Sequence, residues 1–180
     1  MLVLQVCYIS YHYITLVKSY CATAHHNEIT CIDFSHCTIK HDAIITLCKS
    51  IDDSKFISIN KLIFDSITIK HTTWTILLTS INKLQHLIEL NCSHTSINDT
   101  HLPLIGNLLQ PHIGGINVLQ SSMKSLDLSH TNVKCVEQLK LITTLCQSSV
   151  MTKLNLNHCR LSLHSIIELI NALQCTNIRD

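Results

Sequence analysis

The sequence contains little glycine, proline or charge. Its 180 residues include three Gly and two Pro, 14% of them are charged, and the formal net charge is +1. Tight hairpin turns depend on Gly and Pro, so their scarcity disfavours all-β folds rich in hairpins. Nucleic-acid surfaces need clustered Lys and Arg, so we expect no nucleic-acid partner.

Motifs of metal, redox and catalytic chemistry are also missing. The ten cysteines form no CxxC pair, and the sequence has no Gly-rich phosphate loop, GxSxG or HExxH motif. Zinc ribbons, thioredoxin-like sites and the common hydrolase sites carry such motifs. We therefore expect no enzyme activity, no cofactor and no metal. We interpret the cysteines as small, reduced hydrophobic residues of a cytoplasmic protein.

The apolar start of the chain suggests a leader peptide only at first sight. Residues 1–17 contain no early Lys or Arg and are interrupted by Gln5 and by residues 10–13. Signal peptides begin with a basic region, and membrane spans are longer and more apolar. We expect neither, and no membrane partner.

A repeated pattern organises the rest of the sequence, which is 46% hydrophobic. The pattern is apolar-x-x-apolar-x-apolar-x-x-(Cys/Thr/Ile)-x-apolar. Its five copies begin at Ile29, Ile59, Leu87, Met123 and Met151. Their fourth positions follow one another at intervals of 30, 28, 36 and 28 residues. The long interval predicts an insertion loop near residues 110–118, and residues 2–9 fit a sixth, truncated copy with Leu2 aligned to Ile32.

Helical patterns lie between these copies. Apolar residues recur at i, i+3, i+4 and i+7, the spacing of one helix face. The stripes start at Ile14, Ile44, Trp74, Leu102, Val136 and Ile166. Each unit is therefore predicted to be a short strand, a turn and a helix. On this reading Trp74 is a core residue of a helix face rather than a binding anchor.

The repeats resemble the leucine-rich repeat family, in particular its ribonuclease-inhibitor-like subclass with repeats of about 28 residues. The resemblance covers essentially the whole chain. It implies one α/β domain, residues 1–180, of about six repeats: a leucine-rich repeat solenoid (horseshoe) with a parallel concave sheet and convex helices. The family usually has Asn at the ninth position, where Cys and Thr are acceptable substitutes. Ile67 cannot hydrogen-bond the neighbouring backbone, so the second full repeat is expected to be locally irregular.

In this geometry the residues between the inward-facing apolar ones point to the concave surface. The candidate partner-binding residues there are Asp33, Ile63, Lys61, Glu89, Asn91, Asp127, Lys153 and Asn155. They are mostly small or polar and include none of the Trp, Tyr or Arg that dominate interface hot spots. The alternative is that they simply solvate a sheet.

A row of histidines occupies one repeat position, next to the Cys or Thr. Its members are His36, His94, His130 and His158. A metal site or a pH-sensitive patch would use them. Neighbouring strands lie about 4.8 Å apart and the position has no carboxylate, so an exposed turn residue is the favoured interpretation.

The expected function is a non-catalytic scaffold that binds a protein partner on the concave face or its rims. The alternative is a substrate- or ligand-recognition arm of a larger regulatory protein, such as a ubiquitin ligase or a nucleotide-binding innate immune receptor. Solenoids normally end in polar capping units. Neither end of this sequence resembles one, so we expect a segment of a longer protein.

Overall fold

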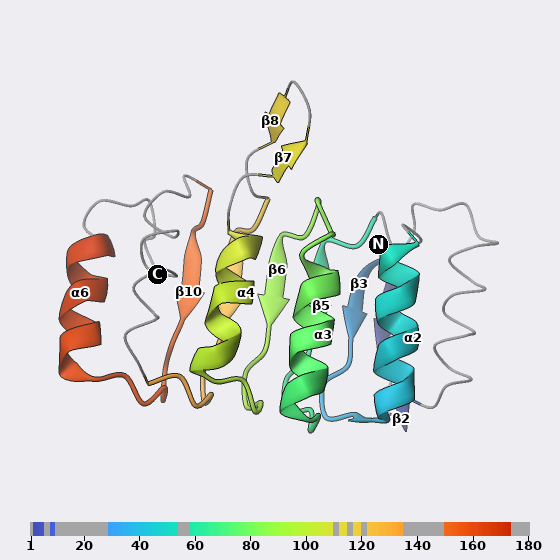
Figure 1. Cartoon of the computed structure of the whole chain (residues 1–180), viewed down its shortest axis with the longest axis horizontal. Coiled ribbons are helices and arrows are strands. Elements are labelled where there is room, and N and C mark those ends of the chain that lie inside the picture. Colours follow the sequence, from blue (N-terminus) through green and yellow to red (C-terminus); the bar gives the residue numbers. More distant parts are fainter. Residues whose placement is uncertain are drawn as a thin grey trace.

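The computed structural model of the chain describes residues 2–5, 8–9, 29–53, 58–109, 112–114, 117–119, 122–134 and 150–173 (Figure 1). None of the described helices combines the length and apolar character that a membrane crossing needs.

A six-stranded sheet forms one layer of the molecule. Its strands are β1 (Leu2–Gln5), β3 (Ile29–Asp33), β5 (Lys61–Ile63), β6 (Glu89–Asn91), β9 (Ser125–Asp127) and β10 (Lys153–Asn155). All adjacent pairs are parallel, and the spatial order β1-β3-β5-β6-β9-β10 follows the sequence. Each repeat therefore adds one strand beside the previous one, as the repeat pattern predicts.

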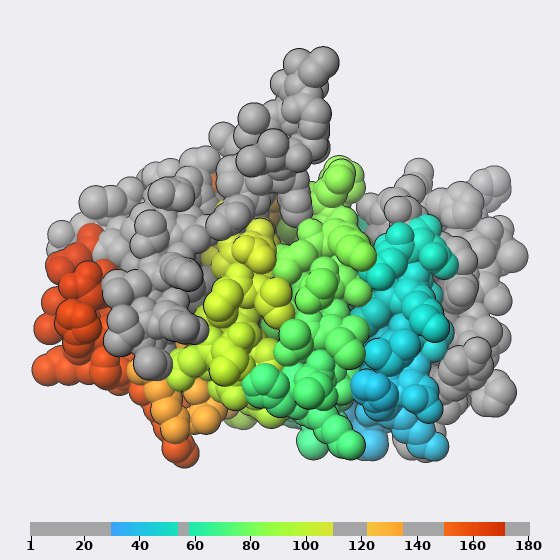
Figure 2. Space-filling model, in the orientation of Figure 1, coloured from blue at the N-terminus to red at the C-terminus, as the bar shows by residue number. Residues whose placement is uncertain are grey.

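Helices form the second layer. They are α2 (His41–Asp52), α3 (His71–Ile81), the 3₁₀ turn η1 (Asp99–His101) that leads into α4 (Leu102–Leu108), and α6 (Leu163–Leu173). In Figure 1 the labelled helices stand on one face of the sheet, and Figure 2 shows α2, α3 and α4 packed side by side. The predicted stripes of α2 and α3 are buried, and Pro103 lies in the first turn of α4. The predicted helices around Ile14 and Val136 lie outside the described residues.

Two smaller sheets accompany the main one. β2 (Tyr8–Ile9) pairs in parallel with β4 (Thr38–Ile39). β7 (His112–Gly114) and β8 (Asn117–Leu119) pair antiparallel and project beyond the main sheet (Figure 1). The predicted insertion near residues 110–118 thus carries a short hairpin.

Aromatic side chains join the two layers in the centre of the core. The rings of Phe34 and Phe64 stack with centroids 5.2 Å apart, and Phe64 meets Trp74 edge-on at 5.7 Å. Trp74 is fully buried, and its Nε1 donates a hydrogen bond to Ser96 Oγ at 3.1 Å. Its predicted role as a core residue is confirmed.

The truncated first repeat pairs in a different register from the one predicted. In β1, Leu4 lies opposite Ile32 and Gln5 opposite Asp33, with a shift after Leu2. In β2, Ile9 still lies opposite Ile39, at the predicted interval of 30 residues. The prediction used the 30-residue interval for the whole repeat. The pairing of β1 is shifted by two residues from that alignment, and because two is even, the same side chains still face the core.

The second full repeat is as regular as its neighbours, so the irregularity expected at Ile67 is wrong. Its strand pairs in register on both sides, and Ser66 has the same φ as the equivalent residues. At the equivalent position of later repeats, Thr95 and Thr131 donate hydrogen bonds of 2.7 and 2.6 Å to backbone carbonyls. Ile67 is instead buried as an apolar side chain, so packing can replace the side-chain hydrogen bond here.

The apolar stripe of α6 differs from its prediction. The helix forms, but Ile166, Ile167 and Ile170 are 39%, 48% and 52% exposed. A solenoid helix buries a flank only where an adjoining repeat packs against it. Helical spacing alone therefore identified the helix but not its buried side.

Candidate binding surface

The regular register collects the candidate residues on one face of the sheet. Lys61, Glu89, Ser125 and Lys153 lie opposite one another across β5, β6, β9 and β10. A second row of direct strand partners contains Asp33, Ile63, Asn91, Asp127 and Asn155. Successive strand residues alternate between faces, so both rows face away from the buried leucines between them. The structure thus brings together all eight predicted candidates.

The Asp and Asn members of the second row also shape the turn after each strand. Asp33 Oδ1 accepts hydrogen bonds from Ser35 N and Oγ at 2.8 and 2.6 Å. The pairs Asn91–Ser93, Asp127–Ser129 and Asn155–Asn157 repeat the backbone contact at 2.8, 2.9 and 3.1 Å. Such Asx turns replace backbone turn hydrogen bonds. We missed this role, although the recurring Asp/Asn-x-Ser/Asn spacing signals it.

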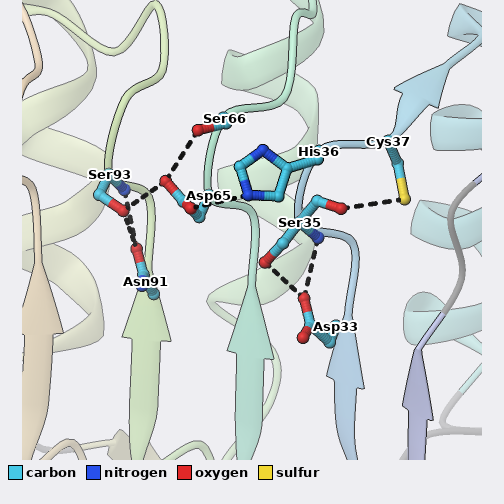
Figure 3. A network of polar contacts seen from close by, with 8 residues as sticks. All are labelled: Asp33, Ser35, His36, Cys37, Asp65, Ser66, Asn91 and Ser93. Atoms are coloured by element: carbon cyan, nitrogen blue, oxygen red, sulfur yellow. Dashed lines mark hydrogen bonds and ion pairs between the residues drawn. The ribbon is translucent and has the colours of Figure 1, made fainter.

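The second full repeat carries Ile63 at this position and uses Asp65 instead. Asp65 Oδ1 accepts hydrogen bonds from Ser66 Oγ at 3.1 Å and from Ser93 Oγ of the next repeat at 2.9 Å. His36 of the preceding repeat leans toward the same carboxylate, with Nε2 3.7 Å from Oδ2 (Figure 3). Asp65 therefore links three repeats along the edge of the face.

Charges on the face are partly compensated. Lys61 Nζ lies 2.8 Å from Glu89 Oε1, with both side chains 36% exposed. Asn155 Nδ2 donates a hydrogen bond to Asp127 Oδ2 at 2.9 Å. These contacts fix side-chain positions, while an ion pair this exposed adds little stability.

The histidine row is more ordered than the sequence suggested. His36, His94, His130 and His158 all have positive φ, between 52° and 57°. In this left-handed conformation the chain turns sharply after each strand and projects the side chains in register. The ring centroids are 4.0 Å apart for His94 and His130 and 4.2 Å apart for His130 and His158, with nearly parallel planes.

Stacking affects the charge and ligand chemistry of these rings. Partial desolvation, followed by repulsion from His94 and His158, lowers the pKa of His130, and Asp127 and Asp65 oppose that shift. The lone pairs of stacked imidazoles lie in parallel planes and do not converge on one point. This geometry disfavours a shared metal ion, and no group of three His, Cys, Asp or Glu in the described residues is arranged to hold one.

A second set of histidines lies at the helix N-termini, a feature that sequence reasoning missed. His41 Nδ1 shares a hydrogen bond with Thr73 Oγ1 at 2.9 Å, and His71 Nε2 with Thr100 Oγ1 at 2.6 Å. The tripeptide Ile-Lys-His, which recurs at residues 39–41 and 69–71, is the sequence feature that could have indicated this set. A shallow cavity of about 350 Å³ lies beside them, lined by Ile39, His41, Thr68, Ile69, Lys70 and Thr73.

The described cysteines belong to the core rather than to a reactive site. Cys31, Cys37, Cys48 and Cys92 are buried, and Cys159 is half-buried. Burial raises the pKa of the Cys31, Cys48 and Cys92 thiols. These three therefore remain protonated at neutral pH and are poor nucleophiles.

No protein-family model matches the chain, and no curated protein matches it. Among solved structures, leiomodin-1 actin-binding site 2 aligns with a TM-score of 0.57 and 13% identity, over 72% of this chain and 71% of that one. An internalin (inlF) from Listeria monocytogenes aligns with a TM-score of 0.42 and 13% identity, over 83% of this chain and 48% of that one. A leucine-rich repeat protein of Leptospira interrogans aligns with a TM-score of 0.28 and 12% identity, over 86% of this chain and 61% of that one.

At such identities a structural likeness extends to the fold alone, and of these three structures leiomodin-1, with a TM-score above 0.5, carries it. The repeat pattern, the parallel sheet in sequence order and the helices on one face agree with that likeness. The chain has an α/β fold of the leucine-rich repeat type.

Proposed function

We propose that the protein is a non-catalytic scaffold that binds a protein partner across the open face of its sheet. One observation carries the proposal: the described helices cover a single face of a parallel sheet (Figure 1). Parallel sheets are normally covered on both faces. Here the uncovered face presents two aligned rows of half-exposed, mostly polar side chains.

The proposal includes a finer fold assignment and a compartment. Repeat intervals of 28 and 30 residues, with helices of 12 and 11 residues in α2 and α3, favour the ribonuclease-inhibitor-like subclass and its horseshoe curvature. The buried, protonated thiols of Cys31, Cys48 and Cys92 favour a reducing compartment, which we take to be the cytoplasm.

Comparison of the two faces tests the binding proposal. A photo-reactive amino acid at Asn91 or Ser125 on the sheet face, or at Thr72 or Ile76 on the helix face, is introduced into the full chain in the cells that make it. We expect one discrete crosslinked protein from both sheet positions and from neither helix position. Crosslinks from the helix positions alone would place the interface elsewhere and refute the proposal.

A second candidate is a recognition arm of a larger regulatory protein, such as a ubiquitin ligase or a nucleotide-binding innate immune receptor. The exposed isoleucines of α6 favour it, because a further unit packed there would bury them. An antibody against this region distinguishes the two candidates on cell extract. A band near 20.3 kDa would identify a free-standing protein, and a much larger band would identify an arm.

A further inference from the structure

The histidine row is interrupted in the second full repeat. Ser66 occupies the histidine position there, with the same φ of 57° as His36. His94, His130 and His158 form a continuous stack, and Ser66 stands next to His94 where a further ring would extend it. Ser66 N donates a hydrogen bond to Ser93 O at 3.0 Å, so the two repeats are in contact at this point. The stack therefore ends beside a short hydroxyl side chain.

A carboxylate lies at the same place. Asp65 Oδ1 accepts a hydrogen bond from the Ser66 hydroxyl and shares the Ser93 hydroxyl proton with Asn91 Oδ1. Its Oδ2 is 3.7 Å from His36 Nε2, which is longer than a direct hydrogen bond. The Asp65 side chain is 25% exposed, whereas that of His36 is 74% exposed and can swing away. Asp65 thus offers a partly buried anionic oxygen next to the interruption.

The surroundings favour a cation with an apolar stem. Asp33 lies on the neighbouring strand, and Lys61, the cation of β5, is already paired with Glu89 at 2.8 Å. Ile63, the last residue of β5, precedes Asp65 by two residues, and its half-buried side chain lies in the same row of strand partners as Asp33 and Asn91. Methylene groups of a long cationic side chain can pack on such a surface while the charged head reaches the carboxylate.

We propose that this interruption is a recognition site for an arginine of a basic partner protein. The guanidinium stacks on the His94 ring and pairs with Asp65, and the arginine stem contacts Ile63. Guanidinium is planar, stacks on aromatic faces and forms forked bonds with carboxylates, none of which lysine can do. His36 and His94 are two strand spacings apart, about 10 Å. One planar group fits between them once the exposed His36 ring, which leans toward Asp65, swings aside.

The site rests on the proposed function and specifies which kind of partner protein would bind. It requires a basic segment with at least one accessible arginine. The carboxylates Asp33 and Asp65 supply the complementary charge, against which the exposed His36, 3.7 Å from Asp65, is a weak competitor, and the end of the stack supplies the selectivity for a flat cation.

Direct binding to the purified full chain tests the site. The probes are fluorescent, capped hexapeptides of six arginines or six lysines, measured by anisotropy at neutral pH. We expect the arginine peptide to bind about tenfold more tightly, because stacking and forked pairing add to a charge attraction that both share.

Three variants locate the effect. Asp65→Asn keeps an oxygen for the two serines but removes the charge, and Ser66→His fills the gap with the residue found in the other described repeats. Each should reduce arginine binding to the level of lysine. Asp127→Asn, a carboxylate of the same face two strands away, is the matched control and should keep the preference. Circular dichroism checks that all three fold.

Three results would overturn the site: equal binding of the two peptides, an arginine preference that survives Asp65→Asn, or one that is lost equally in Asp127→Asn. The last would show a general attraction to an acidic face. If crosslinking from Asn91 and Ser125 still captures one partner in any of these cases, the scaffold function stands and only the arginine site fails.

Discussion

At the scale of single residues, the turn after each strand is the most constrained part of the repeat. His36, Ser66, His94, His130 and His158 adopt a left-handed backbone that costs L-residues about 1–2 kcal/mol. Asn or Gly, which suit this conformation, occupy none of these positions. His is itself among the non-glycine residues enriched at positive φ, and the observed stacking of three imidazoles adds a second reason for its recurrence here.

Substitution of Ser66 by a β-branched residue tests the backbone constraint. We expect Ser66→Val to lower the free energy of unfolding by about 1–2 kcal/mol, since a branched side chain is strained at positive φ. Urea denaturation of the purified protein measures it. The control Thr68→Val, at an exposed position two residues later, should change stability by less than about 0.5 kcal/mol. Equal effects of the two changes would show that Ser66 is not strained.

The histidine stack predicts an acid-sensitive fold. The pKa of His130 lies below its ordinary value of 6.5, mainly through desolvation and then through His94 and His158. The unfolded chain therefore binds the proton more readily. The corresponding stability is present above pH 6.5 and is lost as the pH falls through 6.5 toward the lower folded pKa.

Urea midpoints between pH 8 and pH 5 measure this dependence. We expect the midpoint to fall with acidification and the fall to be smaller in His130→Asn, because Asn tolerates the backbone and cannot titrate. A steeper fall in that variant would contradict the prediction.

At the scale of elements, the sequence predicted α2 and α3 to the level of individual buried residues. Their stripes are set by local spacing, and the two helices pack against each other. The buried flank of α6 was not predictable, because it depends on neighbours that the spacing of Ile166 and Ile167 does not encode. The register of β1 was missed for the related reason that its pairing is non-local, whereas the hairpin of β7 and β8 was missed because the long repeat interval predicts only an insertion loop.

Trp74 is expected to be the most sensitive position of α3. Trp74→Ala should lower the free energy of unfolding by about 3–5 kcal/mol, through the cavity it leaves beside Phe64. The control Ile76→Ala, two residues along the same helix and 39% exposed, should cost less than about 1 kcal/mol. Thermal or urea unfolding distinguishes them, and similar costs would show that the ring is not central to the core.

Truncation on the exposed flank of α6 is expected to have little effect on stability. Ile167→Ala should change the free energy of unfolding by less than about 0.5 kcal/mol, because the side chain is 48% exposed. The same kind of truncation at fully buried Leu77 should cost about 2–5 kcal/mol. A large loss at Ile167 would show that this flank is covered in solution.

At the scale of the whole molecule, the repeat period predicted the architecture. One strand and one helix per repeat gave the sheet in sequence order and the helices on one face. The aligned rows of the candidate surface followed from the same period, so Asn91 and Asp127 were placed correctly beside each other. The Asx turns, the Asp65 network and the ring stacking needed coordinates, since each depends on side-chain direction at a left-handed turn rather than on spacing.

The central claim is that the sheet face binds the partner, and a dissociation constant tests it most directly. Once crosslinking has identified the partner, its affinity is measured for Ser125→Arg, on β9 of the face, and for Thr72→Arg, on the exposed side of α3. We predict that the first variant weakens binding by about tenfold or more, because a bulky charge obstructs the contact, while the second stays near the unmodified protein. Unchanged affinity for Ser125→Arg together with a loss for Thr72→Arg would contradict the account and assign recognition to the helices.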